Sequence, residues 1–147
     1  MKTEFRKAIV PREIDALLAF DRKVFPKADR FDRTYWRECE PYWLIVGRTK
    51  VGCCAFEKRK ESLYISTTGI LPQFQKRGFG PLLKAWEIAY ARYHGCKRIL
   101  TNCRKRNTRM IALNRQFGFR IVRTIPGYYE EPADSSVLME LLLDDAH

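Results

Sequence analysis

The spacing of apolar residues divides the first forty residues into a strand and two helices. The apolar segment Phe5–Val10 predicts a short strand. Pro11 then opens a helix whose apolar residues recur every three or four positions, as in a helix with one buried face. These residues are Ile14, Leu17, Leu18, Phe20 and Val24. A shorter helix is expected over Thr34–Glu40, capped by Thr34 and stopped by Pro41.

Three apolar runs after Pro41 predict an antiparallel meander. Two of them, Tyr42–Val46 and Val51–Glu57, are rich in β-branched and aromatic residues and are separated by a short turn that contains Gly47. This combination is typical of a hairpin. A third run, Leu63–Ile70, follows a basic turn and extends the meander by one strand.

Helical and strand patterns alternate in the second half of the chain. A helix ending at Gly95 is predicted to bury one stripe of residues, namely Leu82, Leu83, Trp86, Ala89, Tyr90 and Tyr93. Further strands are expected over residues 98–103, 119–125 and 137–143, and Pro126 with Gly127 ends the second of them. A helix over residues 107–117 lies between the first two strands. Strand, helix and strand form a βαβ unit, in which a helical crossover joins parallel strands.

Length and composition predict one globular domain. The chain has 147 residues, of which 46% are hydrophobic and 13% aromatic, which is enough for one well-buried core. A single domain over residues 1–147 is therefore expected. No apolar run approaches the roughly 20 residues that span a bilayer, and charges interrupt the N-terminal segment, so neither membrane insertion nor secretion is expected.

The cysteines and the net charge restrict the location and the partners. The five cysteines form no CxxC pair and no zinc-binding pattern, which predicts free thiols, a cytoplasmic location and no metal site. The net charge of +11 favours anionic partners. It does not distinguish a phosphorylated cofactor from a nucleic acid or an acidic protein.

The sequence QKRGFG at residues 75–80 predicts a loop that binds a pyrophosphate. Its two glycines allow a tight turn and a close approach to a ligand, so that several N–H groups point at one anion at the positive end of the next helix. Its Lys and Arg add positive charge, and Pro81 fits the first position of a helix. The spacing differs from that of dinucleotide-binding and P-loop motifs.

The order of elements and two motifs resemble the GNAT superfamily of N-acetyltransferases. The family's loop, Q/R-x-x-G-x-G/A, is matched three residues after Pro72 by Gln75, Gly78 and Gly80. The family also frames a helix over the cofactor by an Asn, an Ala five residues later and a terminal Gly-Phe, here Asn107, Ala112, Gly118 and Phe119. The resemblance implies an α/β (α+β) fold: a mixed, mostly antiparallel sheet of six to seven strands, splayed at the cofactor cleft, with about four helices on its two faces.

The resemblance implies that acetyl-CoA, or another acyl-CoA, donates its acyl group to a primary amine by direct attack in a ternary complex. The loop would hold the pyrophosphate, and the pantetheine arm would pair with the end of the preceding strand. The implied cofactor contacts are Thr68, Gly69, Ile70, Gln75, Lys76, Arg77, Gly78, Phe79, Gly80, Asn102 and Asn107. The acceptor is a protein N-terminus, a lysine side chain or a small amine. The positive net charge disfavours polycationic amines, unless Glu130, Glu131 and Asp134 form a local acidic pocket.

Attack by an amine needs a base, because an amine with a pKa near 10 is mostly protonated at pH 7, and the departing thiolate needs an acid. In many family members a Tyr four residues before the Gly-Phe glycine donates the proton, and in ribosomal-protein alanine acetyltransferases a Glu on the preceding strand is the base. These positions hold Asn114 and Asn102 here. An amide transfers no proton, although it can hydrogen-bond a thiolate or hold a water molecule.

Three tyrosines complete the catalytic candidates. Tyr64 matches the position at which histone-type members carry a catalytic Glu. The pair Tyr128 and Tyr129 is expected on the loop after Gly127. Followed by acidic residues, it resembles the peptide-clamping end of protein N-terminal acetyltransferases. The candidates for catalysis are therefore Tyr64, Tyr128, Tyr129 and Asn114, with Glu130 or Glu131 beside the tyrosine pair as alternatives.

Two other functions stay open on the sequence. The asparagines at positions 102 and 114 also fit a domain that binds acyl-CoA and regulates a partner without turnover. The basic segment Arg104–Arg106 fits an RNA- or ribosome-associated module. A homodimer is common in the family, and the final strand offers an edge for pairing.

Overall fold

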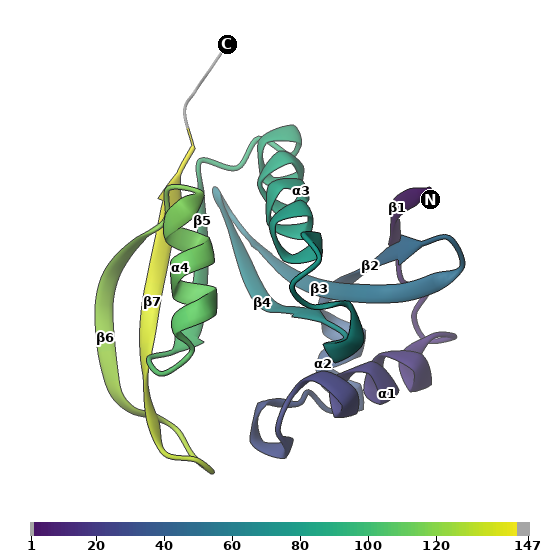
Figure 1. The fold of residues 1–147 in the computed structure, drawn as a ribbon. Coiled ribbons are helices and arrows are strands. Elements are labelled where there is room, and N and C mark those ends of the chain that lie inside the picture. Colours follow the sequence, from purple (N-terminus) through teal and green to yellow (C-terminus); the bar gives the residue numbers. More distant parts are fainter. Residues whose placement is uncertain (1, 144–147) are drawn as a thin grey trace. The chain divides into compact units, whose positions relative to one another are not determined.

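The computed structural model describes residues 2–143. They form a seven-stranded sheet in the order β1-β2-β3-β4-β5-β7-β6, together with four α-helices (Figure 1). The strands are β1 (Thr3–Lys7), β2 (Glu40–Val46), β3 (Thr49–Arg59), β4 (Ser62–Ile70), β5 (Arg98–Arg104), β6 (Arg120–Tyr129) and β7 (Asp134–Leu142). The helices are α1 (Ile14–Val24), α2 (Arg33–Glu38), α3 (Phe79–Tyr93) and α4 (Thr108–Gln116). The predicted class, a mixed and mostly antiparallel sheet with four helices, is confirmed.

The described chain forms two compact units. The N-terminal unit comprises residues 2–57 and 66–80, and the C-terminal unit comprises residues 58–65 and 81–143. Strands β3 and β4 each contribute residues to both units.

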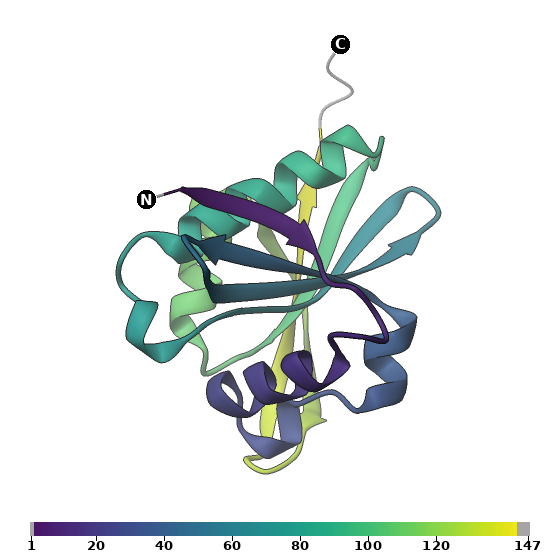
Figure 2. The ribbon, with the colours of Figure 1, turned by 90° about the vertical axis from the view of Figure 1, so that its right-hand side faces the viewer.

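The N-terminal unit is built on the antiparallel strands β1, β2 and β3. Helices α1 and α2 lie beside one another on one side of these strands (Figure 2). The core contains Leu17 and Phe20 from α1, Trp36 from α2, and Trp43 and Cys53 from the strands, all buried. The helical spacing of apolar residues in the sequence therefore identified the buried face of α1 correctly.

The start of α2 differs from the prediction. The cap is Asp32 rather than Thr34, because the Asp32 carboxylate accepts a hydrogen bond from the N–H of Tyr35 at 2.8 Å. Pro41, expected to stop the helix, is the second residue of β2. Its carbonyl accepts the N–H of Ala8 at 2.9 Å, and the start of a strand tolerates the missing proline N–H.

In the predicted βαβ unit, β5-α4-β6, the two strands do not pair directly, because β7 lies between them in the sheet. A parallel pair of the C-terminal unit is formed by β4 and β5 instead. Residues 62–65 of β4 pair in parallel with residues 98–101 of β5, and α3 connects the two strands. Helix α4 packs on β7, where Asn114 contacts Met139 (Figure 1). Strand β7 pairs antiparallel with β5 on one side and with β6 on the other. The prediction that the final strand is an edge for pairing is therefore wrong, because both of its sides are used within the sheet.

Strand β6 is longer than predicted. It continues through Pro126 and Gly127 to Tyr129, with an irregular register after Ile125. Gly127 has a φ of +66°, which a glycine adopts without strain. Tyr128 and Tyr129 consequently lie on a strand and not, as expected, on the loop after it.

Helix α3 buries a different face from the predicted stripe. Leu82 and Tyr93 are 39% and 87% exposed, whereas Lys84 and Glu87 are buried. The ammonium of Lys84 lies 2.8 Å from a carboxylate oxygen of Glu87, so that the two charges neutralise each other inside the core. The helix begins at Phe79, which makes Pro81 its third residue instead of its first. The first turn tolerates proline because its N–H groups have no partner within the helix.

Candidate functional site

The predicted pyrophosphate loop connects β4 to α3 within the N-terminal unit. The side-chain amide of Gln75 donates a hydrogen bond to the carbonyl of Ile70 at 3.0 Å, which ties the loop to the end of β4. Lys76 and Gly78 have φ angles of +63° and +87°. Arg77 lies over the ring of Phe74 at 5.6 Å. The loop thus ends in the first turn of a 15-residue helix, whose N–H groups offer the positive end of the helix dipole to an anion.

The end of β4, where the pantetheine arm is expected, is closely packed on one side. A Cβ atom added to Gly69 would lie 2.9 Å from Val24 and 3.1 Å from Phe25, so that a larger residue there would have to displace these side chains. The pairing of β4 with β5 runs from Ser62 to Ile65, and β4 continues beyond it through Thr68 to Ile70.

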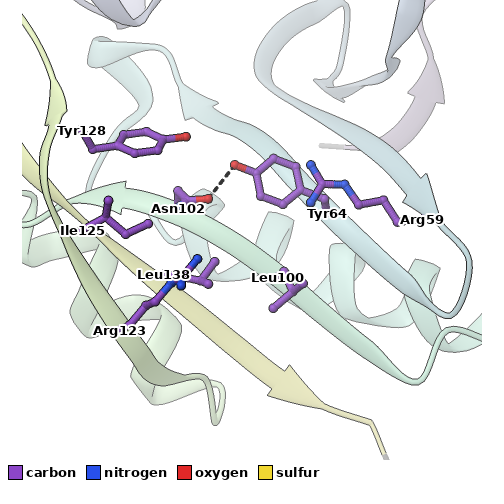
Figure 3. A pocket seen from close by; sticks show the side chains of 8 residues that line it. All are labelled: Arg59, Tyr64, Leu100, Asn102, Arg123, Ile125, Tyr128 and Leu138. Atoms are coloured by element: carbon purple, nitrogen blue, oxygen red, sulfur yellow. Dashed lines mark hydrogen bonds between the residues drawn. The ribbon is translucent and has the colours of Figure 1, made fainter.

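A pocket of about 280 Å³ opens on the C-terminal unit (Figure 3). It lies on the face of β5 and β7 that is opposite α4, because side chains alternate along a strand and Met139 contacts the helix. The lining residues are Arg59, Tyr64, Leu100, Asn102, Arg123, Ile125, Tyr128 and Leu138. The pocket therefore brings together three residues that the sequence singled out separately, Tyr64, Asn102 and Tyr128.

Hydrogen bonds orient the polar groups of this pocket. The hydroxyl of Tyr64 donates to the side-chain oxygen of Asn102 at 2.8 Å, and the side-chain nitrogen of Asn102 donates to the hydroxyl of Ser136 at 2.9 Å. The hydroxyl groups of Tyr64 and Tyr128 point toward one another beside Asn102 (Figure 3). Because an amide transfers no proton, Asn102 orients Tyr64 and does not relay protons from it. The Tyr64 oxygen keeps lone pairs that can accept an N–H group.

The other predicted site residues lie outside the pocket lining. Tyr129 packs edge-on against Tyr128 at 4.8 Å, beneath the guanidinium of Arg104. Asn107 caps α4 by accepting the N–H of Met110 at 3.2 Å. Asn114 is fully buried and donates to the sulfur of Met139 at 3.6 Å. A side chain without exposed surface reaches a substrate only after a rearrangement.

Sequence reasoning missed the two arginines that line the pocket. The guanidinium of Arg59 lies over the ring of Tyr64 at 4.1 Å, and Arg123 reaches the pocket from β6 (Figure 3). Both belong to segments rich in basic residues, but composition does not show which side chains turn toward a common space. The signal in the sequence is the alternation of Arg123 and Ile125 along the predicted strand, which places both side chains on the same face.

A second polar group lies in the N-terminal unit. The hydroxyl of Tyr35 on α2 donates to the carboxylate of Glu57 on β3. Burial and the hydrogen bond to Glu57 raise the pKa of Tyr35 well above its ordinary value. Sequence reasoning missed this pair as well, since it joins residues 22 positions apart.

Of the acidic residues after β6 that could form an acidic pocket, Asp134 is engaged by a basic residue. Asp134 accepts the N–H of Arg106 at 3.1 Å and forms an ion pair with its guanidinium at 3.4 Å. Arg104 donates to the carbonyls of Pro132 and Glu130. The two arginines hold the turn between β6 and β7, a structural role that accounts for part of the basic segment 104–106.

The cysteines are free thiols. Burial raises the pKa of the Cys103 thiol to about 11, so that it is protonated at neutral pH and a poor nucleophile. In residues 2–143, no three His, Cys, Asp or Glu side chains come together in a way that could hold a metal ion. No helix in this part of the chain is long and apolar enough to cross a membrane.

The model of the Acetyltransferase (GNAT) family matches residues 12–119. The chain belongs to the GNAT acetyltransferase family. The predicted resemblance is thereby confirmed, and so is the prediction that the protein is an acetyltransferase. No curated protein sequence is significantly similar to the chain.

Solved structures share the fold of this GNAT protein over almost the whole chain. The ribosomal-protein-S18-alanine N-acetyltransferase from Escherichia coli has a TM-score of 0.88 at 14% identity, over 99% of this chain and 97% of that one. NAA60 from Arabidopsis thaliana, in complex with a bisubstrate analogue, has a TM-score of 0.80 at 18% identity, over 97% of this chain and 100% of that one. A GNAT family acetyltransferase from Elizabethkingia anophelis with acetyl-CoA bound has a TM-score of 0.78 at 19% identity, over 96% of this chain and 98% of that one.

Proposed function

We propose that the protein transfers an acetyl group from acetyl-CoA to a primary amine by direct attack in a ternary complex. The observation that carries the proposal is the pocket in which Tyr64, Asn102 and Tyr128 meet. Membership of the GNAT family supports acetyl transfer, and the acetyl-CoA bound to the Elizabethkingia anophelis relative supports the donor. The free thiols support a cytoplasmic location.

The donor is held by the loop between β4 and α3. Its backbone N–H groups from Gln75 to Gly80 bind the pyrophosphate, and Lys76 and Arg77 each add an exposed charge contact of up to about 1 kcal/mol. The pantetheine arm follows Thr68–Ile70. The hydrogen bond from Gln75 to the carbonyl of Ile70 supports this arrangement, because it couples the two parts of the donor site.

The acceptor amine binds at Tyr64. Its N–H group donates to the Tyr64 oxygen, whose own proton is directed at Asn102. The ammonium form first releases one proton to water. When the neutral amine attacks the thioester carbonyl, the C–N bond forms, the C–S bond breaks, and the second proton lost by the nitrogen is finally taken up by the thiolate. Tyr128 lies where its hydroxyl can assist this transfer, directly or through water. A protein N-terminus, a lysine side chain or a small amine satisfies these requirements.

The proposal is tested by thiol release from acetyl-CoA with a panel of amines and peptides. Tyr64→Phe is expected to lower kcat/KM by about 10- to 100-fold and Tyr128→Phe by a smaller factor, because each removes a hydroxyl from the pocket. Tyr129→Phe, which alters a neighbouring ring outside the pocket lining, serves as the matched control and keeps near wild-type activity. Full activity of both pocket variants between about pH 6 and pH 10 contradicts the site assignment.

A regulatory domain that binds acyl-CoA without turnover is the second candidate. It is favoured by the asparagines at positions 102 and 114, where related enzymes carry groups that transfer protons. Protection of the fold by CoA without thiol release from any acceptor is the result that selects it.

A further inference from the structure

We propose that the outer face of α3 binds a second copy of this chain, so that two α3 helices pack antiparallel across a two-fold axis. The inference goes beyond the proposed function and does not depend on it, because no residue that lines the pocket belongs to α3. It also differs from the predicted pairing through the final strand, whose two sides are both used within the sheet.

Helix α3 has the opposite of the usual distribution of side chains. A surface helix normally turns its apolar side chains toward the core and its charged ones toward solvent. Here Lys84 and Glu87 are buried as a pair, whereas Leu82 and Tyr93 are 39% and 87% exposed. Contiguous apolar residues on a protein surface mark a site of interaction.

The apolar residues of the outer face form one seam. Leu82, Trp86, Ala89 and Tyr93 follow one another at intervals of four, three and four positions, and all are exposed except Trp86, which is half-buried. At this spacing the side chains stay on one line along a helix, as they do where two helices pack together. The seam is about 17 Å long. Another helix is therefore the expected occupant.

The order of side chains along the seam is self-complementary. When two copies pack antiparallel, with the two-fold axis between positions 87 and 88, Trp86 lies opposite Ala89 of the second copy, and Leu82 lies opposite Tyr93. A large ring thus meets a small side chain, and both copies make the same contacts, as a two-fold interface requires. A parallel pair would place Trp86 on Trp86 and Ala89 on Ala89, which crowds one layer and leaves a gap in the next.

The charges of the outer face tolerate a second copy in this arrangement. Within residues 79–93, all of which the structure describes, Arg92 is the only charged residue with an exposed side chain. In the antiparallel pair, Arg92 lies beside Ala85 of the second copy. The two Arg92 residues are about 13 Å apart along the helix axis, which exceeds the Debye length of about 8 Å at physiological salt. The opposed helix dipoles attract each other.

An anionic membrane fits the same face less well. Adsorption to such a membrane requires several basic residues beside the apolar ones, and the outer face of α3 has Arg92 alone. The two occupants also respond oppositely to salt. Two copies with a net charge of +11 repel each other, so salt strengthens the dimer, whereas it weakens binding to anionic lipid.

The size of the seam limits the affinity of the dimer. One helix face of this length covers roughly 400 Å² per copy, about half of the 800 Å² that each partner buries in a standard interface. We therefore expect a Kd on the order of tens of micromolar.

Sedimentation velocity of the full chain tests the proposal, at concentrations between about 5 and about 500 µM. The mean mass is expected to rise from that of the monomer toward that of the dimer. The midpoint of this rise should move to lower concentration when the salt concentration is raised.

Two matched variants locate the interface. Ala89→Glu places a carboxylate and extra volume against Trp86 of the second copy and should raise the Kd by about 10-fold or more. Ala85→Glu changes the net charge equally, but the new carboxylate lies beside Arg92 of the second copy, so the Kd should stay the same or fall. Both sites are exposed, and circular dichroism with urea unfolding verifies that each variant folds. Tyr93→Ser, at the most exposed residue of the seam, should also weaken the dimer.

Four results overturn the inference. The first is a chain that stays monomeric over the whole range of concentration. The second is a dimer that Ala89→Glu and Tyr93→Ser leave intact, which would place the interface elsewhere. The third is equal disruption by Ala85→Glu and Ala89→Glu, which excludes the antiparallel arrangement. The fourth is a monomer that binds vesicles of phosphatidylcholine and phosphatidylserine and loses this binding in Ala89→Glu, which would assign the face to a membrane.

Discussion

Lys84 and Glu87 place two opposite charges in the core of the C-terminal unit. Their side chains are 1% and 0% exposed, and the Lys84 ammonium also lies 5.4 Å from the centre of the Phe119 ring. Removing such charges from water costs several kcal/mol per ion, which the close pairing offsets. The pair therefore holds α3 in one rotation about its axis, the one that exposes Leu82 and Tyr93.

Breaking this pair is expected to destabilise the fold strongly. Glu87→Gln should lower the free energy of unfolding by about 3–5 kcal/mol, because the Lys84 charge stays buried without a full counter-charge. The double variant Lys84→Met with Glu87→Leu should lose less than either single variant. Urea unfolding followed by circular dichroism measures both. A Glu87→Gln protein as stable as the wild type would show that the pair is not buried.

Asp21 makes the stability depend on pH. Burial raises the pKa of Asp21 from 3.8 to about 6, against the hydrogen bond that its carboxylate accepts from the N–H of Phe31 at 2.9 Å. The folded state therefore holds a proton that the unfolded chain has released between these two values. The stabilisation by this proton is complete below about pH 3.8 and is lost as the pH rises through about 6.

Replacing Asp21 by Asn should remove this dependence, since the amide does not titrate and its oxygen can still accept the Phe31 N–H. Between about pH 4 and pH 6 the wild type should lose stability relative to Asp21→Asn by at most about 1.4 kcal/mol per pH unit. Urea unfolding at a series of pH values provides the difference. Two parallel stability curves would assign the dependence to other groups.

The loop between β4 and α3 has a matched control at the other end of α3. Gly78 and Gly95 have φ angles of +87° and +72°, and an added Cβ meets no atom within 4 Å at either position. Alanine at each site therefore introduces a similar backbone strain of roughly 1–2 kcal/mol and no clash. A difference in ligand affinity between the two variants consequently reports on the loop itself.

CoA affinity is expected to separate these variants. Gly78→Ala should raise the Kd of CoA about 10-fold, because the strain turns N–H groups away from the pyrophosphate. Gly95→Ala should bind CoA like the wild type while losing a similar amount of stability. Calorimetric titration with CoA and urea unfolding give the two quantities. Equal affinities in both variants would place the pyrophosphate elsewhere.

At the scale of the whole molecule, we propose that the two units are parts of the single domain over residues 1–147 that the sequence predicts. Strands β3 and β4 each contain residues of both units. Unfolding of either strand would therefore disrupt both units. Their relation differs from that of two domains joined by a linker, which share no strand.

Unfolding should accordingly be one cooperative transition. Trp36 and Trp43 report on the N-terminal unit, and a Trp86→Phe variant restricts the tryptophan fluorescence to them. The urea midpoint of this fluorescence should coincide with that of far-UV circular dichroism, which follows both units. Two separate midpoints would show that the units unfold independently.

The sequence by itself determined the features that depend on neighbouring residues. The hairpin of β2 and β3 and the glycine loop before α3 arise from turn chemistry and spacing within a few positions. The family motifs are equally local. For this reason the sequence was sufficient to infer the fold class, the family and acetyl-CoA as the acyl donor.

Tertiary structure alone decided the strand order, the rotation of α3 and the composition of the pocket proposed to bind the acceptor. Strand β7 enters between β5 and β6, the Lys84–Glu87 pair turns two polar residues inward, and Tyr64 meets Asn102 from 38 positions away. Each of these features depends on the free energy of packing segments that are distant in the sequence. In that free energy, paired charges and shared hydrogen bonds outweigh the preference of a single polar residue for water. The local spacing of apolar residues does not indicate which distant residues will be in contact. The two arginines that line the pocket could therefore be identified only from the fold.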